Sequence, residues 1–317
     1  MIDDRTLWEC VVVGGGAAGL SAALVLGRAR RRVLVLDAGE QSNRPAHGIG
    51  GLLGHDGLAP AELHARGRAE LAAYPSIEVR DVRVIGGSPQ ERGFMLSTAD
   101  SVQVQTARVL LATGMDYAAP DLPGVAELWG ATVFHCPYCH GWEVRDGALG
   151  VLGNAAATHR ALLLRGWSAD VVLLTDGPAD LDADERRQLQ RANVPVVERR
   201  VAGVRGRGGA LEAVLFADGG KLPRDGLLVP APLRQRSSLA SDLGAELTER
   251  GTVDVDAFGQ TTVPGLYAAG DVSSLMPQVA GAIAEGSRAA AMINGDLLAE
   301  QYGIEPMMPR RTAVPTG

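Results

Sequence analysis

The first 40 residues contain the feature that most constrains the fold. An apolar, β-branched run at residues 9–13 leads directly into the glycine-rich segment GGGAAG at 14–19, and a helical pattern follows in LSAALVLGRA. A second apolar run, VLVLD, then ends at Asp37. The order strand, glycine-rich turn, helix and strand is typical of a dinucleotide-binding α/β unit.

Three glycines have separate physical roles in such a turn. Gly14 allows the tight turn, Gly16 lets the backbone approach a pyrophosphate, and Gly19 allows the helix to pack closely against the strand. The start of the following helix stabilises the phosphate charge, and Asp37 can accept hydrogen bonds from ribose hydroxyls. Alone, the motif also fits a merely flexible turn, so it is the surrounding order of elements that favours a dinucleotide site.

A second unit of the same kind begins near residue 147. GALGVLG at 147–153 predicts a strand and a turn, and it is followed by a helical pattern at about 156–166. The apolar run ADVVLLTD at 169–176 then predicts the next strand. The chain therefore contains two strand–turn–helix units, each opened by glycine.

The late sequence returns to the pattern of the first unit. TTVPGLYAAGD at 261–271 is followed by a helical pattern at about 278–299. We therefore predict an α/β protein with two Rossmann-like dinucleotide-binding domains, in which the second is inserted into a discontinuous first. The predicted boundaries are 1–116 for the first part of the first domain, 117–246 for the inserted domain and 247–317 for the second part of the first domain.

Composition argues against several classes of partner. A formal net charge of −7 does not attract nucleic acid or an anionic membrane. No apolar run approaches the roughly 20 residues that span a bilayer, and the N-terminal MIDDRTLWEC lacks the apolar core of an export signal. We therefore expect a soluble cytoplasmic protein that binds neither nucleic acid nor membranes.

Two of the three cysteines, Cys136 and Cys139, form a C-x-x-C motif in FHCPYCHGWE. This spacing lets both sulfurs meet across one turn, which predicts thiol–disulfide chemistry in a cytosolic protein. Structural zinc is the main alternative, but it needs two further ligands and the chain has no second C-x-x-C. We therefore predict no metal site. The third cysteine, Cys10, is predicted to be a buried apolar residue.

Two histidines flank the motif. His140 follows the second cysteine directly, where an imidazole can take up or return a proton as thiol and thiolate interconvert near neutral pH. A histidine in a surface turn is the alternative interpretation of His140. His135, directly before the first cysteine, is a second catalytic candidate.

The order of these motifs resembles the low-molecular-weight thioredoxin reductases over the whole chain. The resemblance rests on the first glycine motif, VLLATG at 109–114, C-x-x-C in the inserted domain and the late GD–Q segment. It implies FAD as the cofactor of the first domain and a homodimer. The long loop 38–60, which is rich in Gly, His and Pro, is also expected to contact FAD. The resemblance also implies that Asp271 bonds the ribityl chain, and that Gln278 and Val279 open a helix whose positive end faces the isoalloxazine. The full candidate FAD-binding set is Gly14, Gly16, Ala17, Ala18, Gly19, Asp37, Ala38, Val82, Ala112, Thr113, Gly114, Gly270, Asp271, Gln278 and Val279.

The redox motif departs from the family's usual Cys-Ala-Thr-Cys-Asp, because this chain has Cys-Pro-Tyr-Cys-His. His140 thus takes the place of the family's proton-donating Asp. The variant is similar to the FAD-dependent dithiol oxidases of disulfide-bearing natural products, such as the enzymes that close the holomycin and gliotoxin disulfides. The resemblance implies that Cys139 is the sulfur near the flavin and that a substrate thiolate attacks Cys136.

The second glycine motif departs from the NADPH site of the reductases. Ala155 stands where a second glycine is expected, and its methyl group obstructs the approach of a pyrophosphate. The next strand ends in Asp176, where the family has a basic segment, and an acid there repels a 2′-phosphate. Two alternatives stay open. Asp176 follows Gly153 by the interval that separates Asp37 from Gly14, which suits a weak NAD site. Positive charge also follows in a helical run at Arg186, Arg187 and Arg191.

These observations predict an FAD-dependent dithiol oxidase that forms a disulfide in a small-molecule dithiol, with O2 as the final acceptor and H2O2 as the product. One rival is a thioredoxin-disulfide reductase supplied by NAD(P)H or another donor, acting on a thioredoxin-like protein. A second rival is a non-catalytic flavin-binding redox sensor, against which the intact C-x-x-C argues. The sequence does not determine which dithiol is the substrate.

Overall fold

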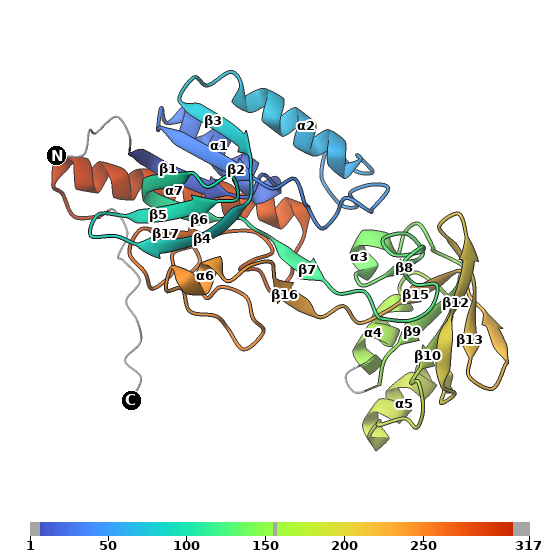
Figure 1. Cartoon of the computed structure of the whole chain (residues 1–317). Coiled ribbons are helices and arrows are strands. Elements are labelled where there is room, and N and C mark those ends of the chain that lie inside the picture. The colour runs from blue at the N-terminus through green and yellow to red at the C-terminus, as the bar shows by residue number, and fades with distance from the viewer. Residues whose placement is uncertain (1–6, 155–156, 307–317) are drawn as a thin grey trace. The chain divides into compact units, whose positions relative to one another are not determined.

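The computed structural model describes residues 7–154 and 157–306, which form two compact units (Figure 1). The first unit contains residues 1–44, 60–116 and 233–317, and the second contains 45–59 and 117–232. The chain leaves the first unit after residue 116 and returns to it at Leu233, and the segment 45–59 groups with the second unit. The domain boundaries at 116/117 and 246/247 stay a prediction.

A seven-stranded sheet forms the centre of the first unit, in the order β3-β2-β1-β6-β5-β4, with β17 also pairing with β6. The strands β3, β2, β1, β6 and β17 run parallel to one another, whereas β4 and β5 join antiparallel. The strands are β1 (Trp8–Val13), β2 (Val33–Asp37), β3 (Ile77–Asp81), β4 (Val84–Pro89), β5 (Phe94–Thr98), β6 (Gln103–Leu111) and β17 (Leu266–Ala268).

Alternate residues of these strands enter two separate cores, because successive side chains of a strand point to opposite faces. One core packs against α1 (Ala17–Arg28) and α7 (Val279–Tyr302), and the other packs against β4, β5 and α6 (Leu239–Asp242). A further helix, α2 (Pro60–Leu71), contributes Leu71 to the first core. Cys10 is fully buried in that core, as predicted, and burial raises the pKa of its thiol to about 12.

A buried polar cluster connects α7 to the sheet. The Tyr267 hydroxyl donates to Asp296 Oδ2 over 2.6 Å, and both side chains are buried. Arg108 on β6 donates to Glu300 over 2.8 Å, and its Nε lies 3.7 Å from Asp296. Buried polar groups cost free energy unless they are paired, so this cluster fixes where α7 lies on the sheet.

The second unit is built on a parallel sheet in the order β11-β10-β9-β15-β8. A separate antiparallel sheet, β12-β13-β14, packs on it through a common apolar core. A capping box at Asp182 begins α5. The elements are β8 (Val133–Phe134), α3 (Pro137–His140), β9 (Ala148–Leu152), α4 (Ala157–Leu164), β10 (Asp170–Leu174), α5 (Ala183–Arg191), β11 (Val196–Val197), β12 (Val201–Arg207), β13 (Ala210–Phe216), β14 (Lys221–Pro223) and β15 (Gly226–Leu228).

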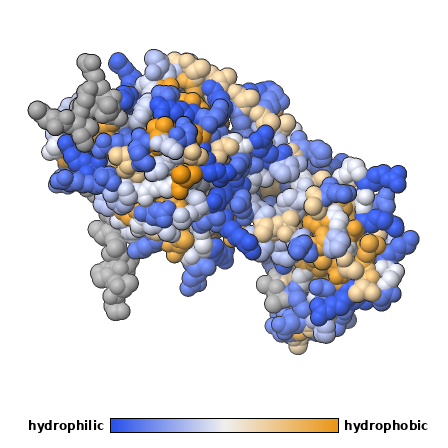
Figure 2. All heavy atoms as spheres, viewed as in Figure 1, coloured by the Kyte–Doolittle hydropathy of each residue, from blue (hydrophilic) through white to orange (hydrophobic). Residues whose placement is uncertain are grey.

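Two short strands lie where the chain passes between the units. They are β7 (Met115–Tyr117) and β16 (Leu233–Gln235), and they pair with each other. Hydrophilic side chains cover much of the visible face of each unit (Figure 2). Among the described residues, we find no helix with the length and apolar character that crossing a membrane requires. The two parallel α/β units confirm the predicted fold class.

Candidate functional site

The candidate FAD-binding residues gather at one edge of the first unit's sheet. Gly14 follows β1, Asp37 ends β2, Val82 follows β3, Ala112 follows β6 and Gly270 comes two residues after β17. These strands are parallel, so their carboxyl ends lie at the same edge, which is where open α/β sheets bind their ligands. Gln278 and Val279 join them at the start of α7.

Three glycines of the turn after β1 have no room for a side chain. A Cβ on Gly14, whose φ is +111°, would collide with the carbonyl oxygen of Ala112, and one on Gly19 would collide with the carbonyl oxygen of Gly14. A Cβ on Gly15 would collide with the Asp37 carboxylate. The sequence did not identify Gly15 as necessary. Glycine is required there because Asp37, on the neighbouring strand β2, fills the space of a side chain. Only open space lies near Gly16, whose nearest neighbour is Gln41 Cγ at 3.9 Å.

Two helices begin at this edge with no side-chain cap from the described part of the chain. Gly16 is the N-cap of α1 and Gln278 is the N-cap of α7, and neither side chain bonds the first turn. The free N–H groups of such a turn, together with the helix dipole, favour negative charge. The open glycine turn and the two uncapped helix starts therefore fit a pyrophosphate and an anionic flavin ring.

Asp37 is buried and held by neighbours that the sequence did not identify. Its carboxylate accepts the N–H of Gly39 at 3.0 Å and the amide of Gln41 at 3.2 Å, and it pairs with Arg68 Nη2 at 2.8 Å. Arg68 on α2 also bonds Asp81 over 2.6 Å. No local pattern in α2 marks Arg68, because its two partners lie on β2 and β3.

Gly270 is fixed by a carboxylate of α7. Its N–H donates to Glu285 Oε2 over 2.8 Å, and a Cβ at this glycine would lie 2.9 Å from Ala18 Cβ. Burial raises the pKa of Glu285. The turn that carries Asp271 is therefore anchored to α7 by a contact that the sequence reasoning also missed.

The redox pair lies in the second unit, where Cys136 and Cys139 form a disulfide with a Cα–Cα distance of 5.4 Å. Cys136 is the N-cap of the short helix α3, and Pro137 occupies the first helical turn. Proline is favoured there because its fixed φ suits the helix and its missing N–H needs no partner. The four-residue motif thus folds locally into one turn with a sulfur at each end.

Both histidines of the motif are half-buried and their pKa values are lowered. His140 stacks on Phe134 with ring centroids 5.7 Å apart, and neither of its ring nitrogens makes a hydrogen bond of normal geometry to the described residues. Burial lowers the pKa of His140 below 6.5, against the opposing charge of Glu143. His135 stacks on Tyr117 at 4.5 Å, and burial lowers its pKa to about 4. Both imidazoles are therefore neutral at pH 7, so His140 can accept a proton there.

The loop 45–59 lies against the redox helix. A Cβ on Gly50 would lie 3.1 Å from the Cys139 carbonyl oxygen, so the backbones are in close contact. A bridge between Ile49 and Leu58 closes the loop, and the N–H of Gly51 donates to Asp56 over 2.7 Å. We expected this region to contact FAD, which stays a prediction. The contact with the redox helix was not foreseen.

Arg160 lies against Gly153, which follows β9. Its guanidinium lies 2.7 Å from where a Cβ of Gly153 would be, and burial lowers its pKa. Ala155, which we expected to obstruct a pyrophosphate, lies outside the described residues. The side chain of Asn154 also bonds the Pro178 carbonyl at 2.9 Å and the Asp180 N–H at 2.7 Å.

Asp176 is engaged by its own chain. Its carboxylate accepts the N–H of Val201 over 2.7 Å and lies 3.8 Å from Arg200. The three basic residues Arg186, Arg187 and Arg191 are exposed on α5.

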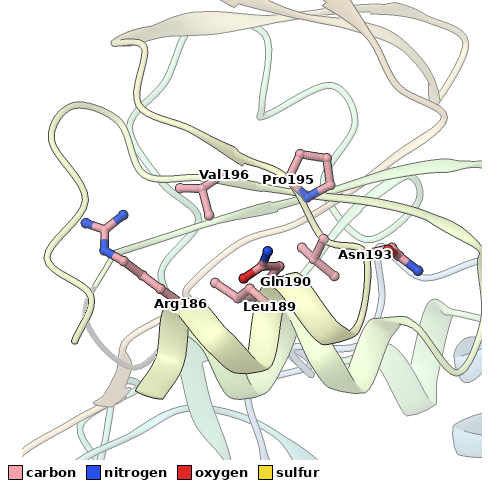
Figure 3. Close-up of a pocket in the computed structure, with 7 residues that line it drawn as sticks. Arg186, Leu189, Gln190, Asn193, Pro195 and Val196 are labelled. Carbon is pink, nitrogen blue, oxygen red and sulfur yellow. The ribbon is translucent and has the colours of Figure 1, made fainter. Parts of the chain in front are cut away.

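An open groove of about 480 Å³ lies between α5 and β11 (Figure 3). Leu189, Val194, Pro195 and Val196 supply apolar side chains to it, and Arg186, Gln190 and Asn193 complete the lining. None of the predicted site residues lines this groove. Within the described ranges, no three His, Cys, Asp or Glu side chains group as metal ligands do.

Known proteins share this combination of fold and motifs. A family model for pyridine nucleotide-disulphide oxidoreductases matches residues 8–286. The chain is 33% identical over 316 residues to thioredoxin reductase tcpT of Claviceps purpurea, and the match covers 95% of this chain and 98% of that protein.

Two solved structures extend the comparison. The putative thioredoxin reductase TrxB of Bacillus anthracis is 34% identical with a TM-score of 0.88, covering 93% of this chain and 99% of that one. HlmI is 38% identical with a TM-score of 0.90, covering 96% of each chain. The chain therefore belongs to the pyridine nucleotide-disulphide oxidoreductase family and is an FAD-binding oxidoreductase of the thioredoxin reductase type.

Proposed function

We propose that this enzyme is a dithiol oxidase, which converts the two thiols of a small molecule into a disulfide. The observation that carries the proposal is Asp176, which follows β10 at the position where the reductases have a basic segment. A carboxylate at this position repels the 2′-phosphate of NADPH. We therefore infer that NADPH does not supply hydride to this enzyme and that electrons enter from thiols instead.

The proposed first half-reaction takes place at the Cys136–Cys139 disulfide. A substrate thiolate attacks Cys136, the Cys136–Cys139 bond breaks, and a mixed disulfide forms. The second substrate thiolate attacks the substrate sulfur of that mixed disulfide, which releases the product disulfide and leaves two protein thiols. His140 is neutral at pH 7 and lies next to Cys139, so it can accept a thiol proton and return one to the leaving sulfur.

FAD supplies a two-electron acceptor for the two protein thiols, which are thereby returned to the disulfide. We assign Asp37 to its ribose, Asp271 to its ribityl chain, and the start of α7 at Gln278 and Val279 to its isoalloxazine. The final acceptor in this proposal is O2, which gives H2O2, and we expect a cytoplasmic homodimer.

A thioredoxin-disulfide reductase is the second candidate. It is favoured by the printed names of the relatives, several of which are thioredoxin reductases. In that case NAD(P)H or another donor supplies the electrons, and the substrate is a thioredoxin-like protein.

Anaerobic stopped-flow mixing separates the two candidates. The oxidised enzyme is mixed with a dithiol, with NADPH and with NADH, and the flavin absorbance is followed. The dithiol should bleach the flavin and neither nucleotide should do so at micromolar concentrations. Rapid bleaching by NADPH or NADH would overturn the proposal in favour of the reductase.

A Cys139→Ser variant is the control for the route of the electrons. It should keep its FAD and lose bleaching by dithiols, because only an intact disulfide can accept the two electrons of a dithiol. Retention of every measurable activity by this variant would instead support a non-catalytic flavin-binding sensor.

A further inference from the structure

The described residues of the second unit expose few large apolar side chains, and these belong to the redox motif, to the residues directly after it and to the loop that contacts it. Among the described residues, exposed large apolar side chains of this unit occur only at Leu53, Tyr138 and Trp142. Tyr138 lies between the two cysteines, Trp142 follows the motif, and Leu53 belongs to the loop that contacts the Cys139 backbone. Exposed apolar side chains scattered singly need no explanation, but a group of them around a reactive centre indicates a binding surface.

Ring contacts hold the two aromatic side chains in place. Tyr138 is 55% exposed and meets Trp167 edge to face, with ring centroids 5.5 Å apart. Trp142 is 65% exposed, and the guanidinium of Arg145 lies 4.0 Å from its ring centroid. Edge-to-face and cation–π contacts restrict the rings, so little conformational freedom is lost when a ligand binds.

The loop 45–59 also holds an exposed apolar side chain, Leu53, in place. Ile49 and Leu52 are buried, whereas Leu53 is 97% exposed. The bridge from Ile49 to Leu58 closes the loop around this tip, and Gly50 seats it on the Cys139 carbonyl. A leucine held at the tip of an ordered loop gives up its contact with water when an apolar ligand covers it.

We propose that Leu53, Tyr138 and Trp142 form the recognition surface of the redox centre and select a small apolar dithiol. This inference rests on the dithiol oxidase function proposed above. Tyr138 stands between the two cysteines in the chain, so a ligand bound against its ring lies close to the disulfide that the substrate reduces. Three side chains suit a small molecule, whereas a protein partner typically buries about 800 Å² and 20–30 residues on each side.

The chemistry on this surface is balanced without a further reactant. Two substrate S–H bonds break and one substrate S–S bond forms, while the Cys136–Cys139 bond breaks and two protein S–H bonds form. The substrate is oxidised by two electrons, and the protein disulfide is reduced by two.

The test compares an apolar dithiol, benzene-1,2-dimethanethiol, with the polar dithiothreitol. Both form six-membered or larger ring disulfides, so they differ mainly in the surface that they present. The FAD-loaded enzyme is mixed anaerobically with each dithiol, quenched with an alkylating reagent, and the reduction of Cys136 and Cys139 is measured by mass spectrometry. The wild type should react roughly tenfold faster with the apolar dithiol, since burying part of one aromatic ring contributes about that factor.

Five variants test which side chains cause the preference for the apolar dithiol. Leu53→Ser, Tyr138→Ser and Trp142→Ala should each lower the ratio of the two rate constants by about threefold or more, because each removes apolar contact area. Tyr138→Phe should keep the wild-type ratio of the two rate constants, because it retains the aromatic ring. Ile85→Ser removes an exposed apolar side chain of the first unit, which is 60% exposed, and it should leave the ratio and both rates unchanged.

The outcomes separate this inference from the proposed function. Equal wild-type rates with both dithiols, or an unchanged ratio in all three variants, would overturn the recognition surface and leave the oxidase intact. Loss of reaction with reduced thioredoxin in the same variants, without a change in the ratio, would assign the surface to a protein. A wild type whose disulfide no dithiol reduces would overturn both proposals.

Discussion

His135 is expected to make the stability of the second unit depend on pH. Burial, with the charge of His140 acting in the same direction, lowers its pKa from 6.5 to about 4. In the unfolded chain a histidine titrates near 6.5, so between pH 6.5 and about 4 the unfolded state binds the extra proton. The stability that depends on a neutral His135 is therefore fully present above pH 6.5, and it is lost as the pH falls towards 4.

The size of the effect follows from the two pKa values. They differ by about 2.5, and each pKa unit corresponds to about 1.36 kcal/mol, so the unit should lose about 3 kcal/mol between pH 6.5 and 4. The His135→Phe variant removes this loss, because phenylalanine cannot take up a proton. It keeps a planar ring against Tyr117 and Trp129, whose centroids lie 4.5 Å and 5.6 Å from that of His135.

Urea unfolding of the wild type and the variant across this pH range measures the difference. Tryptophan fluorescence reports mainly on the second unit, because it contains three of the four tryptophans, Trp129, Trp142 and Trp167. All other titratable groups are present in both proteins, so the difference between the two pH profiles reports on His135. On acidification from pH 6.5 to 4, the free energy of unfolding of the wild type should fall by about 3 kcal/mol more than that of the variant. Parallel profiles would refute the reasoning, because they would mean that burial does not oppose the protonation of His135.

Three further predictions concern the first unit. Tyr267→Phe should lower the free energy of unfolding by about 1.5–3 kcal/mol in a denaturant titration, because it leaves the buried Asp296 without its 2.6 Å donor; an unchanged midpoint would contradict this. Asp37→Asn should weaken FAD binding by about tenfold or more in a fluorescence titration. A hydrogen bond to a charged acceptor contributes about 1.5–3 kcal/mol, and Arg68 loses its ion pair in this variant. Equal affinity of the variant and the wild type would show that Asp37 does not bind FAD. Cys10 should resist alkylation in the folded, reduced enzyme while the other two cysteines react, because burial raises its pKa to about 12, and labelling of all three at similar rates would contradict its burial.

Much of the fold was predictable because it depends on short-range patterns. The run VLVLD predicted β2 with its last residue at Asp37, and the helical pattern at 278–299 predicted most of α7. The redox turn was predictable for the same reason, because a C-x-x-C followed by helix-compatible residues closes within one turn. The candidate FAD residues were predictable as a group, because the carboxyl ends of parallel strands share one edge.

Neighbours that meet across elements were not predictable. Gly15 is required because a carboxylate from β2 fills the space of its Cβ, and Arg68 is placed by two acids on different strands. The loop that contacts Cys139 groups with the second unit although its sequence lies between two segments of the first.

The sequence by itself thus determined which segments become strands, turns and helices, and which residues carry the thiol chemistry, because these follow from the periodicity and spacing of nearby residues. Only the tertiary structure decided which side chains bond to Asp37 and Gly270, which loop contacts the redox helix, and which arginine lies against Gly153. Such contacts depend on how elements pack in three dimensions, and that packing is a property of the whole chain rather than of any one segment.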